Sequence, residues 1–123
     1  MDYIIQISSM LIIDGIYLSQ IGGSLFIPMI EKIQKEKFEI NYNATIFCYI
    51  LLNIALYKFI IIERRHPINA FILGFCIYGV FDSTNYAIFN NYELVPSIID
   101  SIWGGCLFYI VTMITYKMLK VKY

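Results

Sequence analysis

The sequence predicts an all-α fold: an integral membrane four-helix bundle with short loops. Of its 123 residues, 59% are hydrophobic and only 15% are charged, whereas charged residues make up about 25% of an average soluble domain. Four apolar windows are each long enough to cross about 30 Å of hydrocarbon, which takes roughly 20 helical residues. These windows leave no room for a soluble domain, so we expect residues 1–123 to form a single transmembrane domain in the lipid bilayer.

The first window covers residues 3–23. No cationic region precedes it and no small-residue cleavage site follows it, so we expect this helix to remain rather than to be removed as a signal peptide. Residues 31–37 then form a mixed-charge stretch. This stretch fits an amphipathic helix on the membrane surface, and a plain solvated connector fits equally well.

The remaining windows cover residues 42–62, 68–89 and 95–116. The second and third are separated by the charged turn 63–67, in which Pro67 suits the first position of a helix. The third and fourth are separated by the short polar turn 90–93. Connections this short predict antiparallel neighbours.

The distribution of Lys and Arg predicts the orientation of the helices. Four crossings place both termini and the second loop on one side, which carries Lys58, Arg64, Arg65, Lys117, Lys120 and Lys122. The opposite side carries Lys32, Lys35 and Lys37. Because basic residues collect in cytoplasmic loops, both termini are expected in the cytoplasm.

Net charge and cysteine spacing exclude several classes of function. The net charge is zero, so no basic surface points to nucleic acid. The cysteines, Cys48, Cys76 and Cys106, lie in separate apolar windows without metal-binding spacing, and are expected to be small hydrophobic residues. The single histidine, His66, lies in a charged turn. We therefore expect neither a metal nor a cofactor.

Three acids inside the windows are the most informative residues: Asp14, Asp82 and Asp100. A carboxylate at the centre of a bilayer costs about 2.5–3.5 kcal/mol even on the lenient insertion scale. At 1.5 Å per residue, the three acids lie about 14, 10 and 8 Å from the outer helix ends. We therefore expect them to share one polar cluster in the outer half of the bundle.

Polar and aromatic residues at helical spacing provide partners for these acids. The second window adds a row of Tyr49, Asn53 and Tyr57. The residues expected to form the intramembrane binding cluster are Asp14, Tyr17, Asn53, Tyr78, Asp82, Asn85, Asp100 and Trp103. A purely structural alternative remains, because hydrogen bonds between membrane helices also stabilise their packing, by about 0.6 kcal/mol each.

Small residues repeat every four positions beside each acid. They are Gly15, Ser19 and Gly23; Gly79, Ser83 and Ala87; and Ser97, Ser101 and Gly105. Because small residues let membrane helices approach closely, we expect the first, third and fourth helices to pack tightly and the second to be peripheral. The same ladders would also suit a homodimer contact.

Two motifs carry a family resemblance: Tyr-Gly-Val-Phe-Asp-Ser-Thr-Asn at 78–85 and Asp-Ser-Ile-Trp-Gly at 100–104. Over nearly its whole length the chain resembles domain-of-unknown-function family two-one-seven-seven, a family of small four-helix membrane proteins. Phe81 stands where that family has a second Tyr, and Tyr17 where its first helix has Trp. The resemblance implies no activity, but it marks Asp82, Asn85, Asp100 and Trp103.

Three classes of function fit these observations. The leading hypothesis is a transporter or channel, acting as a homo-oligomer, whose acids bind a proton or a small cation, since burial disfavours a charged carboxylate. The alternative is a non-transporting structural or assembly component of a membrane, including a viral membrane. An enzyme acting on lipid is disfavoured, because Asp82 with Ser83 and Thr84 fits a local capping turn and no hydrolase triad is visible.

Overall fold

The computed structural model describes all 123 residues, which fold into helices without a β-strand. The elements are α1 (Asp2–Tyr17), η1 (Leu18–Gly22), α2 (Gly23–Gln34), α3 (Tyr42–Leu56), η2 (Tyr57–Ile61), α4 (Pro67–Ile88) and α5 (Leu94–Leu119). Four continuous helical segments, at 2–34, 42–61, 67–88 and 94–119, are long and apolar enough to cross a membrane. The predicted all-α membrane architecture is confirmed.

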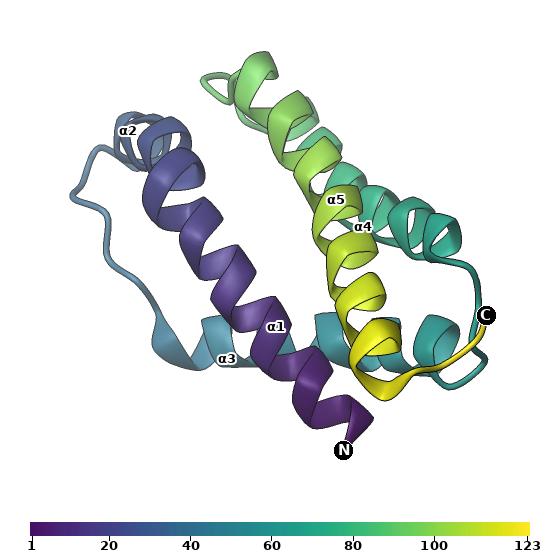
Figure 1. Cartoon of the computed structure of the whole chain (residues 1–123). Coiled ribbons are helices and arrows are strands. Elements are labelled where there is room, and N and C mark those ends of the chain that lie inside the picture. The colour runs from purple at the N-terminus through teal and green to yellow at the C-terminus, as the bar shows by residue number, and fades with distance from the viewer.

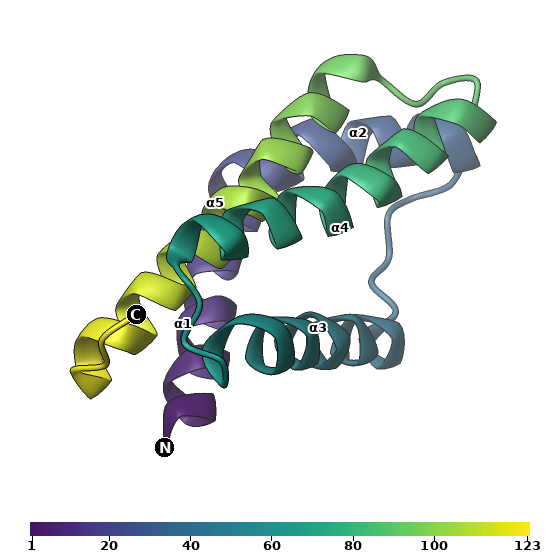
Figure 2. The ribbon, with the colours of Figure 1, turned by 90° about the vertical axis from the view of Figure 1, so that its right-hand side faces the viewer.

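The first helical segment continues well beyond the expected end at Gly23. It passes through the π-helical turn η1 into α2, which ends where Lys35 adopts a left-handed conformation with φ 59°. Gly23 suits this turn because a side chain there would meet the carbonyl oxygen of Leu18 at 2.6 Å. In Figure 2, α2 points away from the direction of α1 and runs towards the turn between α4 and α5. The mixed-charge stretch is thus divided between the end of α2 and the connector to α3.

Side-chain caps mark where two helices begin. The side-chain oxygen of Asn41 accepts the backbone N–H of Ala44 at 3.1 Å, at the start of α3. At the start of α4, the Nδ1 atom of His66 accepts the N–H of Ile68 at 3.0 Å, and Pro67 occupies the first helical turn. Both caps satisfy a backbone donor that the helix itself leaves unpaired. The only histidine therefore has a structural contact at a helix start.

The α4 and α5 helices pack closely and lie side by side in both views of the ribbon (Figures 1 and 2). A side chain on Gly74 would collide with the carbonyl oxygen of Gly104, and one on Gly105 would lie 2.8 Å from the ring of Phe71. These glycines allow the close approach that membrane helices need, since lipid supplies no hydrophobic force between them.

The small-residue ladder predicted on the first helix is wrong. Gly15 has no neighbouring atom within 4 Å of the position of a Cβ, and Ser19 is exposed. In the third helix, the close contact is made by Gly74 rather than by Gly79, where a Cβ would meet only the Ser101 hydroxyl at 3.9 Å. Spacing identifies a face of small residues, but it does not say whether a neighbouring helix covers that face.

In Figure 2, α3 runs below α4 and α5 at an angle to both. It still contributes to the core, where Leu52 and Leu56 pack in one cluster with Met10 of α1 and Phe108 of α5. Both termini lie at the end of the molecule where α3 connects to α4, and the turn between α4 and α5 lies at the other end (Figures 1 and 2). α3 therefore contributes side chains to the core, but its backbone approaches the other helices much less closely than α4 and α5 approach each other, as expected of a peripheral helix.

Candidate functional site

Asp14 receives hydrogen bonds from two other helices. It lies on α1 with only 5% of its surface exposed. Its Oδ1 accepts the indole N–H of Trp103 on α5 at 2.9 Å, and its Oδ2 accepts the phenol hydrogen of Tyr49 on α3. Three helices thus meet at one carboxyl group in the membrane-spanning region.

Asp82 is the most buried of the three acids, with 1% of its surface exposed on α4. The Tyr92 phenol donates to its Oδ1 at 2.9 Å, from the turn before α5. The Ser101 hydroxyl on α5 lies 3.3 Å from its Oδ2 and 2.8 Å from the carbonyl oxygen of Ser97. Because a hydroxyl carries one hydrogen, Ser101 donates to only one of these oxygens at a time.

Asp100 connects Asp82 to the first helix. Its carboxyl lies close to the Asp82 carboxyl across the contact between α4 and α5. The phenol of Tyr17 on α1 lies 3.5 Å from Asp100 Oδ1, a long hydrogen bond. The two carboxyls on α4 and α5 therefore have a hydroxyl donor at each end, Tyr17 from α1 and Tyr92 from the α4–α5 turn.

Stacked aromatic rings join the two parts of this arrangement. The rings of Tyr17 and Trp103 are parallel, with their centroids 4.5 Å apart. Gly22 leaves room for Tyr17, because a Cβ there would lie 2.7 Å from its ring. We define the acid network as Asp14, Tyr17, Tyr49, Asp82, Tyr92, Asp100, Ser101 and Trp103.

No Lys, Arg or His side chain pairs with an acid of this network. The only ion pairs join the N-terminus to Asp2 and Arg65 to Glu63. All donors to Asp14, Asp82 and Asp100 are neutral, so the network has acceptors to spare and no positive charge of its own. No three His, Cys, Asp or Glu side chains converge in a way that would hold one metal ion.

The structure brings together most of the residues singled out from the sequence. Asp14, Tyr17, Asp82, Asp100 and Trp103 lie in the acid network. Tyr78 lies beside the acid network and packs against α5. The ring of Tyr78 occupies the space that a side chain on Gly104 would need. The structure therefore places these three acids in one connected region of the bundle.

Asn53 and Asn85 lie outside the acid network. The amide of Gln6 donates to the Asn53 side-chain oxygen at 2.9 Å and to its backbone oxygen at 3.0 Å, which forms a separate contact between α1 and α3. Asn85 lies near the phenol of Tyr92 and makes no hydrogen bond to a carboxyl. Which groups these two amides contact depends on the angle of α3 and on the path of the α4–α5 turn. Helical spacing in the sequence contains neither piece of information.

Three network residues were not among the predicted site residues: Tyr49, Tyr92 and Ser101. Tyr49 precedes Asn53 by one helical turn in the polar row of the second window, so its position was a usable signal. Tyr92 lies in a polar turn, and its contact depends on how that turn folds back. Burial raises the pKa of the Tyr92 phenol, and the nearby Asp82 carboxyl raises it further, so this donor stays protonated at neutral pH.

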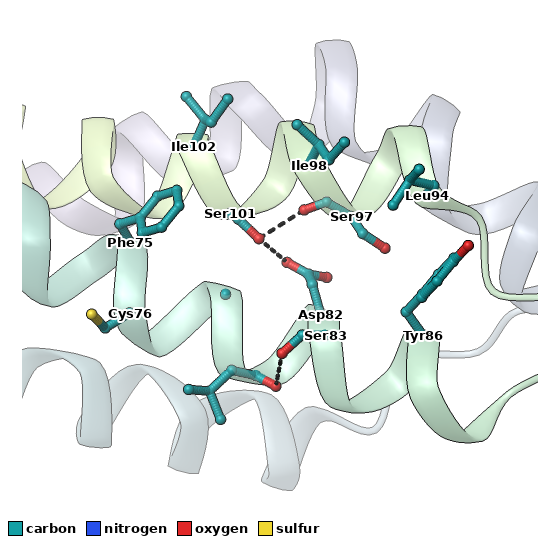
Figure 3. Close-up of a pocket in the computed structure, with 12 residues that line it drawn as sticks. Phe75, Cys76, Asp82, Ser83, Tyr86, Leu94, Ser97, Ile98, Ser101 and Ile102 are labelled. Atoms are coloured by element: carbon teal, nitrogen blue, oxygen red, sulfur yellow. Dashed lines mark hydrogen bonds between the residues drawn. The ribbon is translucent and has the colours of Figure 1, made fainter.

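A groove of about 560 Å³ lies between α4 and α5 on the outside of the acid network. We call it the α4–α5 groove; Figure 3 shows its lining residues. Phe75, Ile98 and Ile102 are among its apolar lining residues. Asp82 and Ser101 lie where the two helices face each other, and their hydrogen bond is visible in Figure 3. The buried carboxyl therefore adjoins a space that opens on the surface of the bundle.

Comparison with known proteins identifies one family. The model of a family described as "Predicted membrane protein (DUF2177)" matches residues 1–117. No curated protein and no solved structure matches the chain. The match covers all four membrane-spanning segments except the last residues of α5.

Proposed function

The chain belongs to the DUF2177 family of membrane proteins, and from the arrangement of its acids we propose that it is a proton- or cation-linked transporter or channel that acts as a homo-oligomer. The observation that carries the proposal is that the Asp82 and Asp100 carboxyls lie close together without any cationic partner. Two charged carboxylates in contact away from water repel each other strongly, so such a pair holds a positive charge between them. A shared proton or a bound cation would supply that charge.

A route for the proton is built from hydroxyl groups. Tyr92 lies in the turn at the membrane surface and donates to Asp82, and Tyr17 donates to Asp100 from the other side. A phenol can accept one proton while it passes on another. We infer that protons reach the carboxyl pair through Tyr92, with both termini on the cytoplasmic side. A four-helix unit is too thin to enclose a wide path, which is why the proposal includes a homo-oligomer.

Proton flux into liposomes tests this proposal. Asp82→Asn and Asp100→Asn should each abolish flux driven by a membrane potential, because each change removes one half of the carboxyl pair. Asp2→Asn is the matched control, since Asp2 lies at the start of α1 and contacts only the N-terminus, Tyr3 and Tyr57. Helix content measured by circular dichroism verifies that each variant is folded. Undiminished flux in both folded variants would overturn the proposal.

A structural role is the second candidate, and the contacts of Asp14 favour it. This carboxyl accepts hydrogen bonds from α3 and α5 while it lies on α1, so it holds three helices in place. If that were the whole function, wild-type protein would carry no flux, and Asp14→Asn would lower stability as much as the changes at Asp82 and Asp100. Size-exclusion chromatography with light scattering would report the homo-oligomer independently.

A further inference from the structure

Apart from the Tyr86 phenol, which can donate a hydrogen bond, the side-chain oxygens that line the α4–α5 groove are available mainly as acceptors. The hydroxyl of Ser97 donates to the Glu93 carbonyl at 2.7 Å, and that of Ser83 to the Val80 carbonyl at 3.3 Å. The hydroxyl hydrogen of Ser101 is used by Ser97 or Asp82. These hydroxyl hydrogens are therefore engaged within the protein, and the lone pairs of their oxygens remain available beside the Asp82 carboxyl.

This lining favours a ligand that carries hydrogen-bond donors and positive charge. An ammonium group has three donors and no acceptor, and an aliphatic amine is protonated at neutral pH because its pKa is about 10.4. Beside Asp82, a carboxylate or a phosphate would instead place its own oxygens against the serine oxygens and a buried acid. The charge that the Asp82–Asp100 pair lacks is the charge that an ammonium group carries.

The rest of the groove is apolar and is reached from the hydrocarbon region. Val80 is 66% exposed and Ile98 is 49% exposed along its edges, and no other helix of the chain covers them. The volume of about 560 Å³ lies within the range of about 300–1,000 Å³ that is usual for small-molecule sites. A ligand that enters here comes from the bilayer and needs an apolar body.

We propose that the α4–α5 groove binds a single-chain amphiphile whose ammonium head contacts Asp82 and whose alkyl chain lies along Phe75, Ile98 and Ile102. The inference rests on the proposed function, because it names the class of cation that the carboxyl pair accepts. When the ammonium group binds, its charge replaces that of the shared proton, which leaves the pair for water. Binding of the amine and release of one proton are thereby linked.

Cys76 provides a direct readout, because it lines this groove. Cys48 lies on α3, and Cys106 lines a different groove beside Phe71 and Tyr109. Purified protein in phosphatidylcholine nanodiscs is treated with N-ethylmaleimide, and alkylation of each cysteine is followed by peptide mass spectrometry. Dodecylamine should slow alkylation of Cys76 alone, whereas dodecanol and dodecanoate, which have the same chain length, should have little effect.

Two variants separate the charge from the space. Asp82→Asn should weaken protection by dodecylamine by roughly 30-fold or more, as expected when one member of a buried charge pair is lost; Glu93→Gln, a nearby exposed acid, should leave it unchanged. Gly79→Leu should fill the groove and abolish protection without touching the carboxyl, because a Cβ there has room. Gly15→Leu is its control on an open face of α1.

Several results would overturn the inference. Equal protection by dodecanol would mean that the groove takes any alkyl chain, and equal slowing at all three cysteines would mean that the amine only partitions into lipid. No protection by the amine, with a change of oligomer mass in Gly79→Leu, would assign the groove to a second copy of the chain. The alkylation assay needs no proton gradient, so it is independent of the flux measurement. If dodecylamine fails to protect Cys76 while proton flux is intact, only the amine-binding inference is rejected. If dodecylamine protects Cys76 and no flux is seen, only the transport proposal is rejected.

Discussion

Tyr17 and Trp103 stack face to face, with ring planes inclined by 5°, and each donates its polar hydrogen to a different acid. The Trp103 indole donates to Asp14 at 2.9 Å, and the Tyr17 phenol donates to Asp100 at 3.5 Å. The stacked pair therefore links the Asp14 contacts to the Asp82–Asp100 pair. The two rings in contact are the structural connection between Asp14 and Asp100.

Trp103 is the only tryptophan of the chain, so its fluorescence reports on this stack alone. Tyr17→Leu removes the ring that covers one face of the indole and should increase quenching by brominated lipid, because the indole becomes accessible to acyl chains. Ile16→Leu, an exposed neighbour on α1, is the control and should leave quenching unchanged. Equal quenching in wild type and Tyr17→Leu would show that the rings do not stack.

Tyr49→Phe removes a single hydroxyl that donates to Asp14. We expect the free energy of unfolding in mixed micelles to fall by about 0.6 kcal/mol, with ~1.7 kcal/mol as the upper end for such bonds in a membrane protein. Tyr42→Phe removes the same hydroxyl from a residue that is 73% exposed, and should change stability little. Equal effects in the two variants would contradict the assigned hydrogen bond.

Gly104→Ala places a methyl group where the ring of Tyr78 lies. Overpacking of this kind should cost about 1–3 kcal/mol, measured as the loss of unfolding free energy in micelles. Gly15→Ala adds the same methyl group on an open face and should be neutral or stabilising by up to about 1 kcal/mol, since Ala favours a helix. A tolerated Gly104→Ala would mean that α4 and α5 do not approach closely at this level.

The buried Tyr92 phenol predicts a loss of stability at high pH. Burial has the largest effect and raises its pKa in the folded protein; Asn85 lowers the pKa in part, and the facing Asp82 carboxyl raises it again. Ionisation is therefore harder in the folded than in the unfolded state, where the pKa is about 10. Its stabilising contribution is complete below about pH 10 and declines as the pH rises above that value. Tyr92→Phe should lower stability near neutral pH and flatten the decline; an unchanged alkaline decline would place Tyr92 in water.

Composition and window length were sufficient for the membrane architecture, because both follow from the hydrocarbon thickness. They could not give the end of the first helical segment, which depends on how η1 and α2 pack against the α4–α5 turn. There the backbone N–H of Glu93 contacts the sulfur of Met29 at 3.1 Å. Hydropathy therefore cannot locate the end of a helical segment when a long-range contact of this kind determines where the segment ends.

The three acids were identifiable because a carboxyl in a membrane span needs partners. Counting residues from the helix ends gives the depth of each acid in the membrane. Similar depths therefore predicted that Asp14 and Asp100 lie in one connected region. The partners were harder to assign: Tyr92 approaches Asp82 from a turn, and Asn53 bonds Gln6 instead of an acid. Such pairings depend on helix crossing and turn conformation, which have no periodic signal.

Infrared spectroscopy of the protein in lipid vesicles tests most directly whether Asp82 and Asp100 share a proton. We expect the carbonyl stretch of a protonated carboxyl at neutral pH, sensitive to exchange into deuterated water. This band should persist in Asp14→Asn and disappear in the double variant D82N/D100N. A wild-type spectrum without a protonated carboxyl, or an unchanged band in the double variant, would contradict the account.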